Sequence, residues 1–98
     1  MSLPLISKLF EELIAAGIEC RENFTCCQSC GHAELSGITD GSYIFYHEQT
    51  ADAIKNGERG IYLNHNIKKQ DVKKVIKILR KYGIPWDGND TSCIEIPV

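Results

Sequence analysis

The chain has 98 residues, of which 43% are hydrophobic and 24% charged, and its formal net charge is −2. A chain of this length can bury a core of its own, so neither a disulfide nor a metal is required merely for folding. The composition excludes a low-complexity or disordered chain, and no apolar run approaches the ~20 residues of a membrane span. We therefore expect a single domain, residues 1–98, that does not enter a membrane.

Two features indicate a reducing compartment. The five cysteines are an odd number and too few for a disulfide scaffold. The first residues, MSLPLISKLFEEL, space their apolar side chains as a helix does, whereas a signal peptide has a basic start and a continuous apolar run. We therefore expect a cytoplasmic location with thiols that stay reduced.

Two amphipathic helices are predicted near the ends of the chain. The first runs from Pro4 to Gly17, and the second, which is rich in lysine, ends at Gly83. In both, glycine can end the helix while the following isoleucine, Ile18 or Ile84, packs back on the last turn. The apolar stripes are Ile6, Leu9, Phe10, Leu13 and Ile14 in the first helix, and Val72, Val75, Ile76 and Leu79 in the second.

The remaining segments predict strands. Residues 42–47 (SYIFYH) are apolar on both phases, and residues 61–65 (IYLNH) alternate. The connection, 48–60, contains a short helical stretch, which fits a right-handed crossover between parallel strands. Beyond the second helix, residues 84–86, a DGND turn and residues 93–97 suggest a hairpin. The predicted fold is α+β: a small mixed sheet of about four strands, two covering helices, a β-α-β unit and a C-terminal hairpin.

The segment FTCCQSCGHAEL, residues 24–35, holds three of the five cysteines and allows three interpretations. In the first, a capping box from Thr25 to Gln28 starts a helix whose N-terminus favours the thiolates of Cys26, Cys27 and Cys30. Cys27 and Cys30 then have the C-x-x-C spacing used in thiol–disulfide exchange. Against a redox role, no predicted β-α-β unit places a strand before this pair.

In the second interpretation, the segment binds zinc. CQSCG spaces two sulfurs as a metal knuckle does, with Gly31 for the tight turn. His32 is the nearest further candidate, but it is too close in sequence to Cys30 to be an easy third ligand. No second ligand pair follows, so further ligands would come from elsewhere in the fold. The candidates are Cys26, Cys20, Cys93, His47 and His65. In the third interpretation, the cysteines are small core side chains, with Cys26 and Cys30 on one helical face.

The histidines add a second group of candidates. His47 and His65 each end a predicted strand, and in parallel neighbours both would lie at the carboxyl ends, where open α/β sheets bind ligands. The sequence contains no recognisable Ser/His/Asp arrangement and no phosphate-binding glycine loop, so no catalytic residue is assigned. The candidate binding site predicted from the sequence comprises Cys26, Cys27, Cys30, His47, Gln49 and His65.

The lysine-rich helix is a candidate contact surface. From Lys68 to Lys81, seven basic residues accompany one acidic residue, which favours an acidic protein partner or a second copy of the chain. We do not expect nucleic-acid binding, because no aromatic residues interleave with the basic ones and the isoelectric point is near 5.9.

Three segments together, FTCCQSCG, FYHEQTADA and GIPWDG, resemble a family of small, mainly bacterial domains of unknown function. The family pattern has CC-x-x-C after an amphipathic helix, YH-x-Q after an aromatic strand, and WDG near the C-terminus. The matching positions are Cys26, Cys27, Cys30, Tyr46, His47, Gln49, Trp86, Asp87 and Gly88. An acid often follows the glutamine in the family, whereas this chain has Thr50 there. The resemblance implies a bacterial intracellular setting and a fold of its own, and it transfers no activity.

Taken together, these patterns predict a small cytoplasmic binding or interaction domain that needs no cofactor and has no catalytic motif. The first alternative is a zinc-binding domain that uses the CC-x-x-C segment, with Cys27, Cys30 and His32 as ligands. The second alternative is a thiol redox protein.

Overall fold

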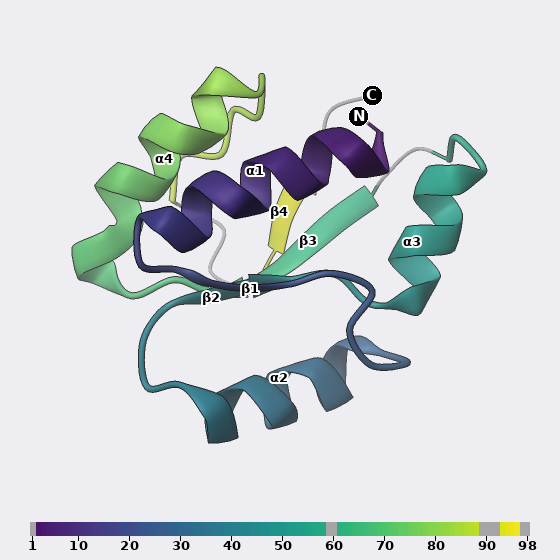
Figure 1. The fold of residues 1–98 in the computed structure, drawn as a ribbon, viewed down its shortest axis with the longest axis horizontal. Coiled ribbons are helices and arrows are strands. Elements are labelled where there is room, and N and C mark those ends of the chain that lie inside the picture. Colours follow the sequence, from purple (N-terminus) through teal and green to yellow (C-terminus); the bar gives the residue numbers. More distant parts are fainter. Residues whose placement is uncertain (1, 59–60, 89–92, 97–98) are drawn as a thin grey trace.

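The computed structural model describes residues 2–58, 61–88 and 93–96, which form four α-helices and a four-stranded mixed sheet (Figure 1). The α+β class and the mixed sheet of four strands are confirmed. The strands are β1 (Glu19–Arg21), β2 (Tyr43–Phe45), β3 (Ile61–Asn66) and β4 (Cys93–Ile96), in that order across the sheet. The helices are α1 (Leu3–Ala15), α2 (Gln28–Ile38), α3 (Glu48–Lys55) and α4 (Val72–Lys81), the last preceded by a 3-10 turn, η1 (Lys69–Asp71).

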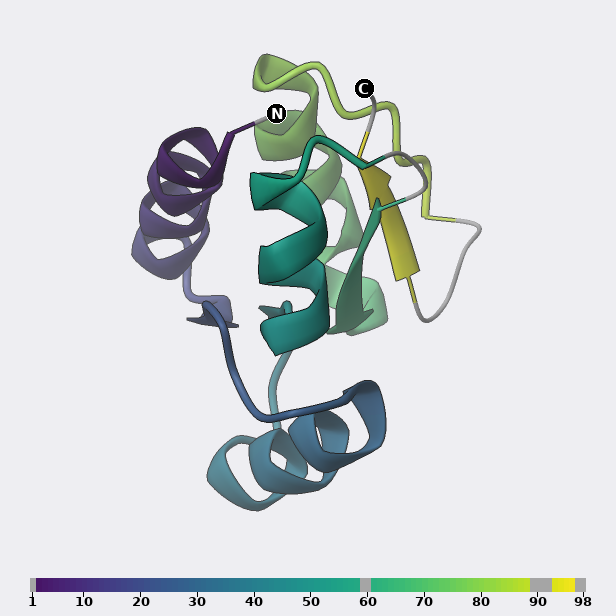
Figure 2. The ribbon, with the colours of Figure 1, turned by 90° about the vertical axis from the view of Figure 1, so that its right-hand side faces the viewer.

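The helices are distributed unequally over the sheet. α1 and α4 lie on one face, α2 lies by itself on the other, and α3 stands at one end (Figures 1 and 2). The main core lies under α1 and α4, where Leu9 and Leu79 are fully buried. α2 covers a smaller cluster made by Leu35, Tyr43 and Phe45. The two predicted amphipathic helices therefore cover one face, and the thiol segment belongs to the other.

Within the described ranges, no helix combines the length and the apolar character that crossing a membrane would require.

The ends of α1 and α4 form as their sequences predict. Gly17 and Gly83 have positive φ angles of 94° and 76°, which a residue without a Cβ adopts at little cost. The amide of Ile18 then donates to the carbonyl of Leu13 at 3.0 Å, and Ile84 repeats this arrangement at the end of α4. Both isoleucines are buried. Each helix end therefore also contributes a side chain to the core.

The predicted parallel pairing of the strands at 42–47 and 61–65 is wrong. β2 and β3 are antiparallel, with Ile44 opposite His65. The connection leaves and re-enters the sheet at the same end, so α3 stands at that end instead of crossing a face (Figure 1). α3 has eight residues and buries only Thr50 and Ala51, a stripe too small to cover a sheet face. A connection of this length fits either strand direction, so its length alone did not predict how the strands pair.

The parallel β-α-β unit of the fold is β1–α2–β2. β1 pairs parallel with β2, with Cys20 opposite Ile44, and α2 lies in the connection between them. β1 was not predicted, because three residues, Glu-Cys-Arg, are too few to show a strand pattern. The thiol segment therefore does follow a strand in a β-α-β unit, contrary to the expectation from the sequence.

The C-terminal strand also pairs differently from the predicted hairpin. Residues 84–86 form no strand, and β4 pairs antiparallel with β3. The amide of Ile84 is used to cap α4 by donating to the carbonyl of Leu79, so it is not available to a sheet ladder. The turn predicted at residues 87–90 lies partly outside the described residues, and Pro97 lies wholly outside them.

A close approach between α2 and the sheet occurs at Gly31. This residue is buried, and a Cβ added to it would lie 2.5 Å from Cζ of Phe45, well inside van der Waals contact. One helical turn further on, Leu35 is fully buried in the same small cluster. Gly31 therefore sets the distance between α2 and the sheet, and with it the position of the thiols on the first turn.

Candidate metal centre

Three cysteines lie at the start of α2. The helix begins at Gln28, and Cys27 is its N-cap residue in an extended conformation. Thr25 has a positive φ of 63°, which is uncommon for a β-branched residue. Its hydroxyl donates to the carbonyl of Cys27 at 2.9 Å. The N-cap residue is Cys27 and not Thr25, so the predicted capping box is wrong. This turn brings Cys26 back beside the first turn of the helix.

The sulfur atoms of Cys26, Cys27 and Cys30 form a compact group. All three lie within 4.8 Å of one another, and the sulfurs of Cys26 and Cys30 are 4.0 Å apart. In a tetrahedral site with Zn–S bonds of about 2.3 Å, two sulfurs are about 3.8 Å apart. Small side-chain adjustments would therefore let one ion contact all three sulfurs. Over the described part of the chain, no histidine, carboxylate or further cysteine joins these three sulfurs as a fourth member of the group.

The exposure of these thiols contradicts the interpretation as core side chains. Cys26 and Cys30 are exposed, and Cys27 is half-buried. Cys26 also precedes the helix, so it shares no helical face with Cys30. The three thiols are therefore accessible to a metal ion or to an oxidant.

The two thiols of the C-x-x-C pair, at the N-terminus of α2, differ in pKa. Cys27 makes no capping hydrogen bond of ordinary geometry, yet the nearby amide of Cys30 lowers the pKa of Cys27. The thiols of Cys30 and Cys26 lower it further, because each donor stabilises the thiolate. Donation to Cys27 and Cys26, together with repulsion from their thiolates, raises the pKa of Cys30 to about 11. Of this pair, Cys27 is therefore the first to lose its proton.

This difference predicts the alkylation behaviour of the metal-free protein. Because only the thiolate reacts, the rate at Cys27 should rise with pH through a midpoint below the ~8.5 of an ordinary cysteine, and at Cys30 through a midpoint near 11. Iodoacetamide labelling, resolved by tandem mass spectrometry, measures both midpoints. A midpoint at or above ~8.5 for Cys27 would contradict this assignment.

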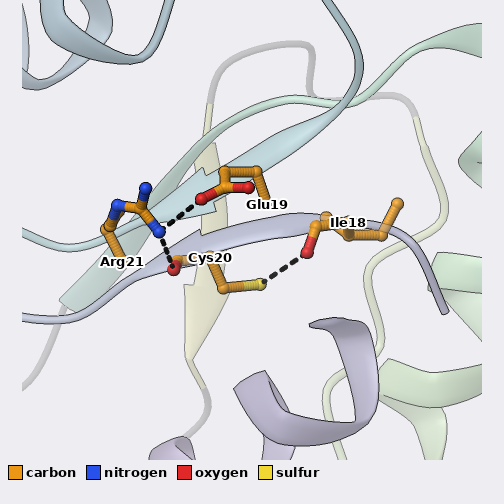
Figure 3. A network of polar contacts seen from close by, with 4 residues as sticks. All are labelled: Ile18, Glu19, Cys20 and Arg21. Atoms are coloured by element: carbon orange, nitrogen blue, oxygen red, sulfur yellow. Dashed lines mark hydrogen bonds and ion pairs between the residues drawn. The ribbon is translucent and has the colours of Figure 1, made fainter. Parts of the chain in front are cut away.

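Cys20 takes no part in the thiol group. Its side chain is buried in the main core, on the opposite face of the sheet from α2. The thiol of Cys20 donates to the carbonyl of Ile18 at 3.7 Å (Figure 3). Arg21 pairs with Glu19 and also donates to the carbonyl of Cys20 at 3.4 Å. Burial raises the pKa of Cys20 to about 12. This thiol therefore stays protonated in the folded protein.

His32 also lies outside the thiol group, although the sequence offered it as the nearest third ligand. Its Nδ1 is 2.6 Å from the hydroxyl of Tyr43. The ring packs against Phe45, with centroids 5.1 Å apart and planes almost perpendicular. Partial burial lowers the pKa of His32. The imidazole is thus held by contacts with Tyr43 and Phe45 beneath α2. Cys26 replaces His32 as the third candidate ligand.

His47 and Gln49 line a cavity on the same side of the sheet as α2. Its volume is about 310 Å³, and the first residue of α2, Gln28, contributes to its wall. Other lining residues are Thr50, Tyr62, Asn64 and Cys93. Sequence reasoning noted Thr50 only as a neighbour of His47 and missed Asn64, and both are buried. The available signal was the amide side chain of Asn64 directly after the apolar residues 61–63 of a predicted strand.

The structure separates His65 from the other candidates. Its ring is buried in contact with Trp86, with centroids 5.1 Å apart, and its Nδ1 accepts from the amide of Ile67 at 3.2 Å. Strand alternation places it on the face covered by α1 and α4, together with Leu63 of the main core. The structure therefore gathers Cys26, Cys27 and Cys30, places the cavity of His47 and Gln49 on the same face, and leaves His65 on the other.

The chain matches the family described as Domain of unknown function (DUF6891) over residues 6–98. The chain belongs to this family. The match includes the thiol group and both His47 and Gln49, and it confirms the resemblance to a family of unknown function. No curated protein and no solved structure matches the chain. Because the family description names no activity, the geometry of the thiol group carries the functional argument.

Proposed function

We propose that the chain is a metal-binding domain in which Cys26, Cys27 and Cys30 hold one zinc ion. The observation that carries the proposal is the gathering of three accessible sulfur atoms within 4.8 Å of one another. Thiolates are soft ligands that favour zinc, copper(I) and iron–sulfur clusters over calcium or magnesium. Zinc accepts four tetrahedral ligands, so three thiolates leave one position open. Zinc binding was the first alternative from the sequence, and here Cys26 replaces His32 as the third ligand.

The lowered pKa of Cys27 supports this assignment. A metal ion binds the deprotonated thiol, so the thiol that ionises first offers the first bond. Once bound, the ion would replace the proton on Cys30, whose own pKa is about 11. Zinc binding should therefore release protons, and the affinity should fall as the pH is lowered.

Metal analysis of the wild-type protein tests the proposal directly. Protein purified without a chelator, or stripped and then titrated with zinc against a coloured chelator, should take up about one equivalent. Bound zinc should also protect Cys26, Cys27 and Cys30 from alkylation, since metal and alkylating agent compete for the same thiolates. Less than about a tenth of an equivalent, with no uptake on titration, would exclude the proposal.

A second candidate function, thiol–disulfide exchange, is favoured by one specific observation. Cys27 and Cys30 begin a helix that follows β1 in a parallel β-α-β unit, the setting in which C-x-x-C pairs exchange disulfides. The Cys27 thiolate would attack a substrate disulfide and release one substrate thiolate. Cys30, after losing its proton, would then attack the mixed disulfide and release the second. The substrate is thereby reduced, and Cys27 and Cys30 are oxidised to a disulfide. A reduction potential below about −300 mV would mark a structural pair and oppose this role.

The basic surface of α4 is proposed to contact an acidic partner or a second copy. Lys73, Lys77 and Arg80 are exposed. Nearby, Lys74 pairs with Asp71 at 3.1 Å, and this ion pair uses part of the positive charge. What supports the proposal is the concentration of positive charge on one exposed helix of an acidic chain.

A further inference from the structure

One imidazole on the same side of the sheet as the thiol group has an unused buried nitrogen. Nδ1 of His47 is buried and has no hydrogen-bond partner, the one such side-chain atom among the described residues. A buried polar atom without a hydrogen-bond partner destabilises the folded state. His47 is the N-cap residue of α3, but its side chain makes no capping hydrogen bond. No hydrogen bond at Nδ1 therefore fixes the orientation of the ring.

His47 lies on the same side of the sheet as the thiol group. Tyr46 packs in the main core, so alternation along the chain directs the next residue to the face of Phe45, which contacts Gly31 of α2. The cavity wall shared by His47 and Gln28 supports the same placement, because Gln28 directly follows Cys27.

Two backbone hydrogen bonds join the neighbours of His47 to the residues just before the thiols. The amide of Phe24 donates to the carbonyl of Tyr46 at 2.8 Å, and the amide of Glu48 donates to the carbonyl of Thr25 at 3.2 Å. Figures 1 and 2 both show the start of α3 next to the start of α2. Residue 47 is therefore held beside the turn that carries the cysteines.

We propose that His47 supplies the fourth ligand, so that the ion is held by three thiolates and one imidazole. This inference rests on the proposed zinc site. In the structure, the ring nitrogens of His47 lie outside the group formed by the three sulfurs. Rotation of the ring about its Cα–Cβ bond breaks no hydrogen bond at Nδ1, because that nitrogen has no partner. His32, by contrast, would lose its contact with Tyr43. Binding would also give a partner to a ring that now has an unsatisfied buried nitrogen.

Cobalt(II) reports the ligand set and serves as the test. Full-length wild-type protein, His47→Ala and His32→Gln are titrated with cobalt, and zinc affinity is measured by competition. Loss of a residue that only orients a metal ligand costs about 10–100-fold in affinity, so loss of His47 itself should cost at least about 100-fold. The visible bands of His47→Ala should move to longer wavelength as water replaces the imidazole, and added imidazole should restore them. His32→Gln, which can keep a hydrogen bond to Tyr43, should behave as the wild type.

A second measurement uses only the wild-type protein. In nitrogen-15 spectra of the histidine rings, zinc should shift one ring nitrogen of His47 and leave His32 and His65 unchanged. If zinc binds through the three cysteines but His47→Ala keeps the wild-type spectrum and affinity, this inference is overturned while the metal site stands. If the wild type binds no zinc, both fail together.

Discussion

Replacing Gly31 with alanine should lower the free energy of unfolding by about 1–3 kcal/mol. The new Cβ would overlap the ring of Phe45, which is fully buried and therefore has little freedom to move away. Adding a methyl group to a packed contact of this kind forces the backbone or the neighbouring side chain to shift, and costs of this size are typical. Urea unfolding, followed by circular dichroism, measures the change.

Gly37 in the same helix provides a matched control. Nothing lies within 4 Å of a Cβ at this position, and alanine is favoured over glycine in a helix by roughly 0.5–1 kcal/mol. Gly37→Ala should therefore stabilise the protein, although the chemical change is identical. A Gly31→Ala variant as stable as the wild type would show that α2 is not held close to the sheet at this position. Because Gly31 directly follows Cys30, its displacement should also weaken zinc binding.

Replacing Cys27 with serine should raise the dissociation constant for zinc by at least about 100-fold, or about 2.7 kcal/mol. Cys27 is at the helix N-terminus, and its pKa is lowered by the amide of Cys30. A serine hydroxyl is a hard ligand that stays protonated at neutral pH, so it cannot replace a thiolate. Cys26→Ser and Cys30→Ser should weaken binding in the same direction, because all three sulfurs belong to one group.

Cys93→Ser is the control for this series. Cys93 is half-buried on β4 and lies outside the group of three sulfurs, so its replacement should leave zinc affinity and stoichiometry unchanged. Competition titration against a chelator, with folding checked by circular dichroism, separates loss of a ligand from loss of structure. Zinc affinity of Cys27→Ser within about twofold of the wild type would contradict the proposed centre.

The helices were predictable from the sequence because their signals are local. The apolar stripe of α1 repeats at helical spacing, and the Gly-Ile pairs at Gly17 and Gly83 form the expected helix ends. The strands were harder to predict from the sequence. β1 is three residues long, and residues 84–86 were predicted as a strand although the amide of Ile84 caps α4. The number of strands was therefore predicted correctly, but residues 84–86 were taken as a strand and β1 was not.

The arrangement of the three cysteines could not be predicted from the sequence. The sequence located all three cysteines in one segment. Its zinc interpretation named Cys27, Cys30 and His32, with Cys26 only among further candidates, while its core interpretation placed Cys26 and Cys30 on one helical face. The observed arrangement depends on the positive φ of Thr25, a conformation that a β-branched residue rarely adopts. It also depends on the sheet, which holds His32 against Tyr43 and away from the sulfurs.

The sequence by itself determined the fold class, the two amphipathic helices and the segment that carries the accessible thiols. Each of these follows from spacing or composition within one stretch of chain. Only the tertiary structure decided which candidates meet. Antiparallel pairing of β2 and β3 with Ile44 opposite His65 sets the register that places His65 on the face of the main core, while His47 stays on the face of α2. Strand direction is set by contacts between distant segments, since a connection such as residues 48–60 can close either way.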